Sequence, residues 1–394
     1  MDILRLLGRQ HELFEKDIEN FAAKLQSIVE DSRFLVIGGG GSIGQAVCRQ
    51  LFVRKAKALH VVDLNENYLV ELVRDIRSHY GYVTKDFDTF ALDCGSESFT
   101  DFIAKGNYDY ILNLSAMKHV RSENCTFSIE RMIKVNILNV LSTYNAAVDI
   151  GAKKYFCVST DKAANPANFM GATKRAMELC LMNKETKIPI SGARFANVAF
   201  SNGSLLEGFL KRIEKRQPLS LPSDVRRFFI SDDEAGIICM FSALLGDKNQ
   251  IFFPHNSSEI KLTFFKDVAY NFLYSLGKKP IDCYNEQDAR DLMLTVDTSK
   301  YWPVNLFSTD TAGEKPFEEF YTPTEVVNFN KFEELAMIDF KPEKTLADVK
   351  NFLAHISSIK PHDSDARDMY FEIMHEFVPT FQYRGAKRFL NSRM

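Results

Sequence analysis

Four consecutive glycines, Gly38 to Gly41, follow directly after the apolar run FLVI at residues 34–37. With Gly44 they make a GxxGxxG pattern, which opens a stretch of helical spacing. Glycine allows a tight turn and a close approach to the backbone, and the free N–H groups at a helix start attract phosphate. A plain turn between a strand and a helix needs no such density of glycine. The pattern predicts a nucleotide-binding turn, whose contact residues we expect to be Gly38, Gly41, Ser42, Ile43 and Gly44.

Short β-rich runs then alternate with stretches of helical spacing. The expected strands are 34–37, 58–62, 88–92, 108–114, 154–159 and 191–198. The expected helices between them are 43–54, 67–79, 128–149 and 170–183. Strands that alternate with helices predict a parallel sheet covered on both faces, and right-handed crossovers make such a sheet doubly wound. The fold class is therefore α/β, of the Rossmann type.

The length of 394 residues indicates two domains, or one domain with a smaller lobe. Near the N-terminus, five apolar residues from Phe14 to Ile28 form one stripe at helical spacing, over residues 13–29. The strand IFFP at 251–254 and a helix at 261–277 fall where the alternation degrades, and we assign them to a smaller lobe. We expect an N-terminal helical extension, the nucleotide-binding domain, a mainly substrate-binding lobe and a C-terminal helical extension, at 1–32, 33–195, 196–320 and 321–394.

Composition excludes several classes of protein. The net charge of −3 argues against a general nucleic-acid binder. The seven cysteines include no CxxC pair and no zinc-like spacing with histidine, which predicts free thiols in a reducing cytoplasm and no metal site. No apolar run approaches 18 residues, so we expect no membrane span. The N-terminal stripe should pack on the main domain or on a partner subunit, and we expect a homo-oligomer.

Acidic residues end two of the expected strands. Asp63, 25 residues after Gly38, can accept hydrogen bonds from both hydroxyls of an adenosine ribose, which favours NAD over NADP. It could instead cap the following helix. Asp93 could reach the adenine amine or could be a cap as well, and Cys94 beside it is counted among the cofactor contacts.

The stretch NLSAMKHV, residues 113–120, follows the fourth expected strand. Leu114, Ser115 and Ala116 suit packing against a cofactor because two of them are small. Lys118 and His119 then point to the crevice at the strand ends, where such sheets bind ligands. A solvated Lys–His pair is the alternative interpretation.

The stretch STDKAANPANFMGATK, residues 159–174, begins at the end of the fifth expected strand. Thr160, Asp161 and Lys162 therefore emerge at the same crevice, and an adjacent acid and amine can serve as proton donor and acceptor. Lys174 falls on the next helix, from which it can hydrogen-bond a nicotinamide ribose. The alternative is a loop with an exposed ion pair.

The stretch RRFFIS, residues 226–231, supplies two arginines after a basic helix. Arg226 or Arg227 could bind a second pyrophosphate, which would belong to the substrate rather than to the cofactor. A solvated arginine is the alternative.

In order, GGGGSIG, SAMKHV, STDKAANPANFMGATK, RFANVAFSNGS and RRFFIS resemble the motifs of extended short-chain dehydrogenases that act as nucleotide-sugar 4,6-dehydratases. The most similar group is the capsule-type branch, which acts on nucleotide-linked N-acetylglucosamine. The resemblance covers roughly residues 33–235. The N-terminal helix, KHVRSE and DTAGEKPFEEF at 310–320 resemble a subgroup linked to legionaminic-acid-type sugars, which implies a GDP-linked substrate. The residues themselves do not separate guanine from uracil.

This resemblance implies a reaction and a set of roles. NAD takes hydride from sugar C4, the resulting ketone acidifies the C5 proton, and Lys162 removes that proton. Asp161 protonates the departing C6 hydroxyl, and hydride returns to C6 to give a 4-keto-6-deoxy sugar. Thr160 and Lys174 hold the C4 hydroxyl and the ribose. The remaining substrate contacts implied are Asn197 near the sugar and Arg227 near the diphosphate.

Met170 departs from the usual pattern, because most of these enzymes carry a tyrosine base four residues before the second lysine. Some members of this branch also have methionine there. Asp161, or a water held by Thr160, would then accept the C4 hydroxyl proton. A C5-inverting dehydratase, a 4-epimerase and a silent NAD-binding module stay as alternatives. The Asp161–Lys162 pair argues against the epimerase, and the retention of Lys162 and Lys174 argues against the silent module.

Overall fold

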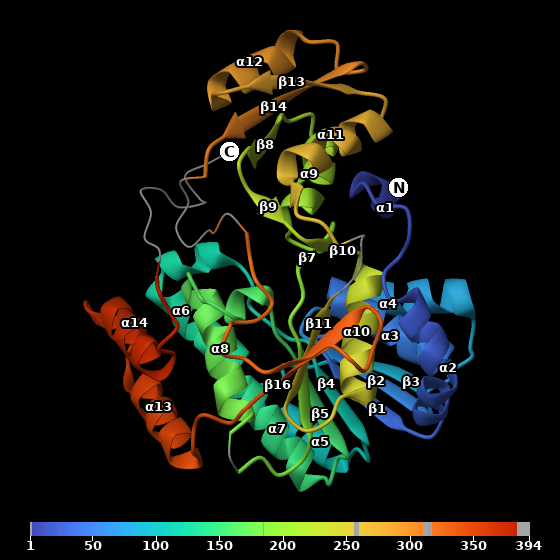
Figure 1. The fold of residues 1–394 in the computed structure, drawn as a ribbon, viewed down its shortest axis with the longest axis vertical. Coiled ribbons are helices and arrows are strands. Elements are labelled where there is room, and N and C mark those ends of the chain that lie inside the picture. Colours follow the sequence, from blue (N-terminus) through green and yellow to red (C-terminus); the bar gives the residue numbers. More distant parts are fainter. Residues whose placement is uncertain (1, 184, 256–259, 310–314, 316, 384–394) are drawn as a thin grey trace.

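The computed structural model describes residues 2–183, 185–255, 260–309, 315 and 317–383 (Figure 1). Within these residues a nine-stranded sheet forms the centre of the molecule, in the order β15-β16-β11-β6-β5-β4-β1-β2-β3. Seven neighbouring strands are parallel: β11 (Gln250–Pro254), β6 (Ile190–Ala193), β5 (Lys154–Val158), β4 (Tyr110–Asn113), β1 (Arg33–Ile37), β2 (Ala58–Asp63) and β3 (Phe87–Ala91). Two antiparallel pairs add β16 (Leu335–Asp339) and β15 (Val327–Asn328) at one edge.

The strand order reverses at β1. The chain runs from β1 outward through β2 to β3, and then returns to place β4 on the other side of β1. In open parallel sheets, ligands bind beyond the carboxyl ends of the strands at such a reversal. Gly38 follows β1 and Leu114 follows β4, so the glycine-rich turn and the NLSAMKHV stretch both lie at this point.

Helices cover both faces of the sheet, as the alternation predicts (Figure 1). In β1, Phe34 and Val36 belong to one hydrophobic core, and Leu35 and Ile37 belong to the other, because successive side chains point to opposite faces. The first core contains α2 (Glu15–Glu30), α3 (Ser42–Val53), α4 (Glu66–Tyr80) and α10 (Asp232–Leu245). The second contains α5 (Glu97–Lys105), α6 (Thr126–Ile133), α7 (Asn139–Asp149), α8 (Phe169–Leu181), α13 (Leu346–Ser358) and α14 (Ala366–Phe377).

The single helix expected at 128–149 is interrupted. A π-helical turn, η2 (Lys134–Leu138), separates α6 from α7. Inside this turn the fully buried Asn136 donates to the Met117 carbonyl at 3.0 Å and accepts from the Met117 N–H at 2.9 Å. Turns of this kind often occur at functional sites. Here it holds the segment that leads to Lys118 and His119.

A smaller lobe stands above the carboxyl ends of the strands (Figure 1). Its three-stranded sheet is parallel and pairs β13 (Lys279–Cys283), β14 (Tyr301–Phe307) and β8 (Leu219–Pro222). The helices of this lobe are α9 (Leu205–Glu214), α11 (Phe265–Ser275) and α12 (Glu286–Thr295). Two short pairs lie between the lobe and the sheet: β7 (Asn197–Val198) with β10 (Phe229–Ile230), and β9 (Arg226–Arg227) with β12 (Thr263–Phe264).

Several expected elements lie elsewhere than predicted. The run 191–198 is split, because β6 ends at Ala193 and β7 pairs with β10 outside the main sheet. The assignment of IFFP to the smaller lobe is wrong, since β11 pairs with β6 in the main sheet. Residues 321–394 supply β15 and β16 as well as the helices expected there, because the apolar run LAMID at 335–339 completes the sheet edge; residues 384–394 lie outside the described residues.

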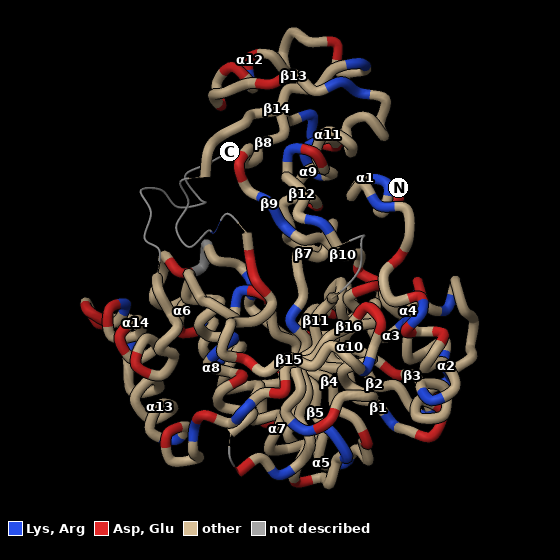
Figure 2. Tube along the Cα trace, in the orientation of Figure 1, with Lys and Arg blue, Asp and Glu red and all other residues tan. Residues whose placement is uncertain are grey.

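The N-terminal extension contacts both parts of the molecule. Helix α1 (Ile3–Leu6) places Leu6 and Leu7 in the core of the smaller lobe, whereas α2 places Leu25 and Val29 in the core under the main sheet. Charged side chains of both signs are interspersed over the outer helices, and the central strands carry few of them (Figure 2). Among the described residues we find no helix with the length and apolar character needed to cross a membrane.

Candidate active site

A cleft of about 410 Å³ opens between the carboxyl ends of the main strands and the smaller lobe. Most of the residues predicted as site residues line it. They are Gly38, Gly41, Ser42, Ile43, Gly44, Leu114, Ala116, Lys118, His119, Thr160, Lys162, Met170, Lys174 and Asn197. The cleft therefore unites segments that are more than 150 residues apart in the chain.

The glycine-rich turn forms one end of the cleft. Gly38 has a φ of +76°, and a Cβ atom there would lie 2.7 Å from the Ser115 backbone nitrogen. A Cβ atom on Gly44 would lie 2.3 Å from the Gly38 carbonyl oxygen. Gly41 caps α3 without a side-chain hydrogen bond, so the first N–H groups of the helix are directed at the cleft. These features fit a pyrophosphate bound at the helix N-terminus.

Asp63 ends β2 beside this turn. Its carboxylate accepts hydrogen bonds from the Gly40 N–H at 2.9 Å and the Asn65 N–H at 2.8 Å. The N-cap of α4 is Asn65, which accepts from the Tyr68 N–H, and not Asp63. Asp63 therefore stabilises the glycine-rich turn, and the contact with a ribose stays a prediction.

Three further predicted cofactor contacts lie beside the cleft rather than on its lining. Asp93 accepts from the Gly95 N–H at 2.9 Å, while Ser96 is the N-cap of α5. The Cys94 Sγ atom lies 4.0 Å from the Ser115 Oγ atom, and burial raises the pKa of this thiol. Ser115 donates from its N–H and its hydroxyl to the Asn113 side chain, at 3.0 and 2.6 Å. Their contacts with a cofactor stay predictions.

Lys118 and His119 line the cleft near the smaller lobe. The His119 ring lies against Gly203, where an added Cβ atom would be 2.7 Å from the His119 Nε2 atom. The loss of surrounding water in the cleft lowers the pKa of Lys118, and Glu207 opposes this shift. Both side chains are near enough to the smaller lobe to contact a ligand held between the two parts.

The Thr160, Asp161 and Lys162 side chains converge on one carboxylate oxygen. The Asp161 Oδ1 atom accepts from the Thr160 hydroxyl at 2.8 Å, the Lys162 N–H at 2.9 Å and the Lys162 Nζ atom at 3.1 Å. Asp161 is 3% exposed and lies behind the lining, whereas Thr160 and Lys162 face the cleft. An amine on the cleft that shares a proton with a buried acid can serve in proton transfer.

Helix α8 begins close to this group. A Cβ atom on Gly171 would lie 2.6 Å from the Lys162 carbonyl oxygen, so only glycine allows this approach. Met170, the residue before Gly171, lines the cleft and is 4% exposed. Lys174 donates from Nζ to the Val158 carbonyl at 3.1 Å. Burial lowers the pKa of Lys174 to about 8, although Cys157 and Glu178 oppose the shift.

A buried ionic network supports the catalytic segment from below. Glu178 of α8 accepts from the Ser159 hydroxyl at 2.6 Å and from the Arg194 guanidinium at 2.6 and 2.9 Å. Arg194 also donates to both carboxylate oxygens of Glu325 at 2.9 Å. Burial lowers the pKa of Arg194, but the attraction of the two carboxylates is stronger and raises it overall. The sequence patterns gave no indication of this network, because its members come from three distant segments.

The two remaining predicted substrate contacts differ in position. Asn197 lines the cleft on β7. Arg227 is 4% exposed and does not line the cleft; its guanidinium donates to the Lys315 and Arg226 carbonyls, each at 2.9 Å. A contact between Arg227 and a diphosphate stays a prediction.

Other residues of the cleft were missed by the sequence analysis. They lie on α4, on the loop before α9 and on the lobe: Tyr68, Phe195, Ser201, Asn202, Gly203, Ser204, Phe229 and Phe265. The motif RFANVAFSNGS contains five of these residues, and so that stretch carried a usable signal. Tyr68 and Phe265 lie in ordinary amphipathic helices, where nothing distinguishes them from packing residues.

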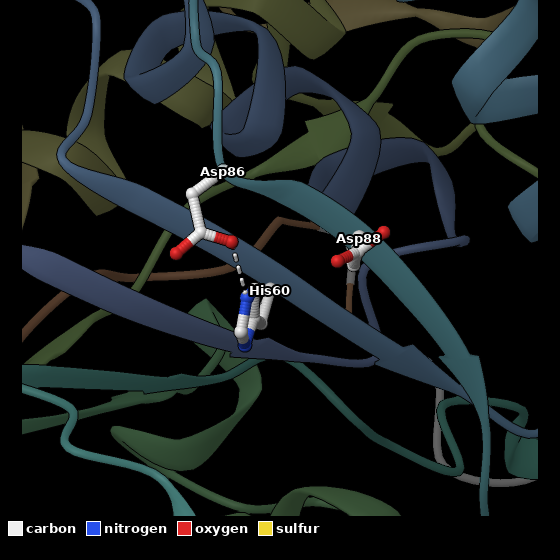
Figure 3. Close-up of side chains that lie close together, drawn as sticks. All are labelled: His60, Asp86 and Asp88. Atoms are coloured by element: carbon white, nitrogen blue, oxygen red, sulfur yellow. Dashed lines mark hydrogen bonds and ion pairs between the residues drawn. The ribbon is translucent and has the colours of Figure 1, made fainter.

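Among the described residues, one group has three side chains spaced as metal ligands could be. It consists of His60, Asp86 and Asp88 (Figure 3). Both ring nitrogens of His60 are engaged, with the Tyr108 hydroxyl at 2.8 Å and the Asp86 carboxylate at 3.0 Å. Asp86 also pairs with Arg33 at 3.1 Å. His60 and Asp86 are therefore satisfied by contacts within the protein, and neither residue lines the cleft.

The sheet and the lobe above it together have the fold of the extended short-chain dehydrogenases. The solved dTDP-glucose 4,6-dehydratase DesIV from Streptomyces venezuelae, with NAD bound, has a similar fold, with a TM-score of 0.57, 15% sequence identity, and coverage of 88% of this chain and 99% of that one. The model of the polysaccharide biosynthesis protein family matches residues 34–339, and the chain belongs to this family.

Curated relatives agree with this membership. The probable polysaccharide biosynthesis protein EpsC of Bacillus subtilis is 27% identical over 325 residues, 82% of this chain and 49% of that protein. A UDP-N-acetylglucosamine 4,6-dehydratase (inverting) of Campylobacter jejuni is 31% identical over 208 residues, 50% of this chain and 59% of that protein. A UDP-glucose 4-epimerase of Rickettsia bellii is 27% identical over 232 residues, 56% of this chain and 65% of that protein. The chain spans about half the length of EpsC. Its relatives thus include nucleotide-sugar dehydratases and epimerases.

Proposed function

We propose that this protein is an NAD-dependent nucleotide-sugar 4,6-dehydratase acting on nucleotide-linked N-acetylglucosamine. The observation that carries this proposal is the pair formed by Lys162 and Asp161, 3.1 Å apart at the cleft beside the glycine-rich turn. Elimination of water needs a base at C5 and an acid at the C6 hydroxyl, and an amine beside a carboxyl group supplies both. The dehydratases among the relatives support the same reaction class.

The residues present fit NAD. Gly38 and Gly44 let the turn fold tightly against neighbouring backbone, where a Cβ atom would clash, so that the start of α3 is open to a pyrophosphate. Asp63 stands next to the turn, and Lys174 lies deeper in the cleft. When bound, NAD would supply the oxidation at sugar C4 and the later reduction at C6. The chain itself holds the sugar, moves the protons and excludes water.

Lys162 takes the C5 proton once C4 is a ketone. The C5–H electron pair forms the C5–C6 double bond, and the C6–O bond breaks. Asp161 gives its proton to the departing hydroxyl, which leaves as water. When C6 takes up hydride, Lys162 gives a proton back to C5, so that the amine is neutral again and Asp161 remains the carboxylate that accepts its hydrogen bond at 3.1 Å. The burial of Asp161 keeps bulk water away from this exchange.

The methionine at position 170 leaves the C4 hydroxyl without a tyrosine base. Thr160 offers another path, because its hydroxyl faces the cleft and donates to the Asp161 carboxylate at 2.8 Å. The C4 hydroxyl can pass its proton to the Thr160 oxygen while Thr160 passes its own to Asp161. Thr160→Val would remove this relay and Thr160→Ser would keep it, so only the valine variant should lose turnover, by about 10-fold or more.

An epimerase of the same sugar nucleotide is the second candidate, because UDP-glucose 4-epimerases are among the relatives. Inversion at C4 alone needs no acid and base at C5 and C6. The Asp161–Lys162 pair therefore favours dehydration. A dehydratase that also inverts C5 needs the same two residues, and it differs only in the face on which the proton returns.

The test is turnover of UDP- and GDP-N-acetylglucosamine, side by side, in deuterated water. The dehydratase predicts loss of one water in the mass spectrum, one solvent deuterium at C5, and transfer of the C4 hydrogen to C6 without exchange. An unchanged mass with a new C4 configuration would instead establish an epimerase. Tight NAD binding without any change in either sugar would contradict both enzymes. NMR of the product gives the configuration at C5.

A further inference from the structure

The chain returns from the smaller lobe to the main sheet through residues 315–325, of which 315 and 317–325 are described. Polar contacts fix both ends of this return segment. At its start, Arg227 donates to the Lys315 carbonyl at 2.9 Å. Further along, Arg194 donates to the Phe320 carbonyl at 3.0 Å and Asn165 donates to the Glu319 carboxylate at 2.9 Å. The segment is thereby held against the same loop that carries Asp161 and Lys162.

Glu318 lies in the middle of the return segment with its side chain turned inward. It is 3% exposed, whereas the neighbouring Glu319 is exposed. The Glu318 Oε2 atom is buried without a hydrogen-bond partner, and the Lys315 Nζ atom lies 3.5 Å from it. A buried carboxylate oxygen without a hydrogen bond costs stability, which calls for a functional explanation.

The charged groups that face Glu318 come from three segments. Lys162 and Asp161 lie on the catalytic loop, Lys315 lies on the return segment, and Arg227 lies on β9. Burial raises the pKa of Glu318; Lys162, Lys315 and Arg227 oppose the shift, and Asp161 adds to it. Glu318 therefore interacts electrostatically with both members of the Asp161–Lys162 pair.

We propose that Glu318 is a positioning residue for the reaction, which stabilises the ammonium ion that forms on Lys162. The role of Glu318 in turnover rests on the proposed function, whereas its interaction with Lys162 does not. When Lys162 takes a proton, a second carboxylate beside Asp161 stabilises the new positive charge. Asp161 can then hold or release its own proton while Lys162 stays paired with a negative charge.

The interaction is tested without turnover by trace labelling with acetic anhydride, which acetylates only the neutral amine. Peptide mass spectrometry gives the extent of labelling at Lys162 against pH. In Glu318→Gln the labelling midpoint should move to lower pH by about 1 unit, because the amine loses an anionic neighbour. Glu319→Gln is the matched control, since Glu319 is on the same segment, exposed and bound to Asn165; it should leave the midpoint where it is.

An unchanged Lys162 midpoint in Glu318→Gln would overturn the proposal, whatever the enzyme turns over. Should this variant not fold, Glu318→Ala makes the same measurement with water in place of the carboxylate. If the wild type converts the sugar nucleotide, a second readout applies. Glu318→Gln should lower kcat by about 10- to 100-fold with KM nearly unchanged, and Glu318→Asp should restore most of kcat. Loss of kcat with the wild-type pH profile in all variants would indicate a merely structural role.

Discussion

The two ends of the cleft are built by different means. The glycine-rich turn is formed mainly by neighbouring residues after β1, with Asp63 as a more distant support, and its proposed contacts with a ligand are backbone groups. The catalytic end consists of side chains, and residues from distant segments hold them, among them Glu178, Arg194 and Glu325. The difference teaches that a phosphate-binding turn can be recognised from one short stretch, whereas an acid–base pair depends on the completed fold.

The largest expected effect is at the catalytic end. Lys162→Ala removes the proposed C5 base without touching the glycine-rich turn, so turnover should fall by about 10²–10⁴-fold while the Kd for NAD changes little. Kinetics with the sugar nucleotide and a fluorescence titration with NAD check both halves. Near-normal turnover would remove Lys162 from the mechanism, and equal losses in both measurements would mean that the two ends are not separable.

The second-largest effect is expected for the buried network of Glu178, Arg194 and Glu325, which supports the catalytic segment. Arg194→Met removes one of the two buried arginines that pair with both Glu178 and Glu325, the other being Arg175. Such a loss costs up to about 3–5 kcal/mol of unfolding free energy. Denaturant unfolding measures it. The control is Lys153→Ala, which breaks the exposed pair with Asp109 at 3.0 Å and should cost at most about 1 kcal/mol. Similar costs for the two variants would show that the buried network is not what holds this end together.

The start of α8 gives a pH-dependent test. Glu123 accepts from the Met170 N–H at 2.9 Å and is 2% exposed, and burial raises its pKa to about 7 despite the backbone hydrogen bonds and Arg367. A raised folded-state pKa means that stability present below the unfolded value of about 4.5 is lost as pH rises through about 7. The shift corresponds to about 3 kcal/mol.

Glu123→Gln keeps the oxygen that accepts from Met170 but cannot ionise. Unfolding free energies of the variant should therefore vary less between about pH 4.5 and 7 than those of the wild type, and should exceed them at pH 8. Parallel pH curves for the two proteins would contradict the assignment of this stability loss to Glu123.

The smallest effect is expected at the glycine-rich end. Gly38→Ala places a Cβ atom 2.7 Å from the Ser115 nitrogen at a φ of +76°, so the turn must shift and NAD should bind about 10-fold more weakly. Gly208→Ala on α9 is the control, because its Cβ atom would meet nothing within 4 Å. Isothermal titration with NAD decides; equal affinity of both variants would mean that the turn tolerates a side chain.

Much of the main domain could be predicted, because the spacing of apolar residues and the positions of glycines can be read from short stretches of sequence. Strands β1 to β5 begin and end within two residues of their expected positions. Most of the residues expected at the site, including Lys162, Met170 and Lys174, line one cleft. The strand β11 was misplaced because a short apolar run does not reveal which sheet it joins.

What could not be predicted depends on contacts between distant segments. Glu318 stands in GEKPFEEF, a stretch that resembled a subgroup but offered no chemistry, since nothing local indicates that one of two adjacent glutamates faces inward. Arg194 and Asn136 look ordinary in sequence for the same reason. The π-turn at η2 has no pattern of its own, because one extra residue in a helix barely alters the apolar spacing.

The N-terminal segment bridges the two halves of the molecule, with α1 on the smaller lobe and α2 beneath the main sheet. Between them Arg9 donates to Glu234 at 2.8 Å, where both side chains are buried at the start of α10. Any hinge motion that widened the cleft would have to strain or release this tether. The width available to a ligand is thus governed in part by residues that never meet it.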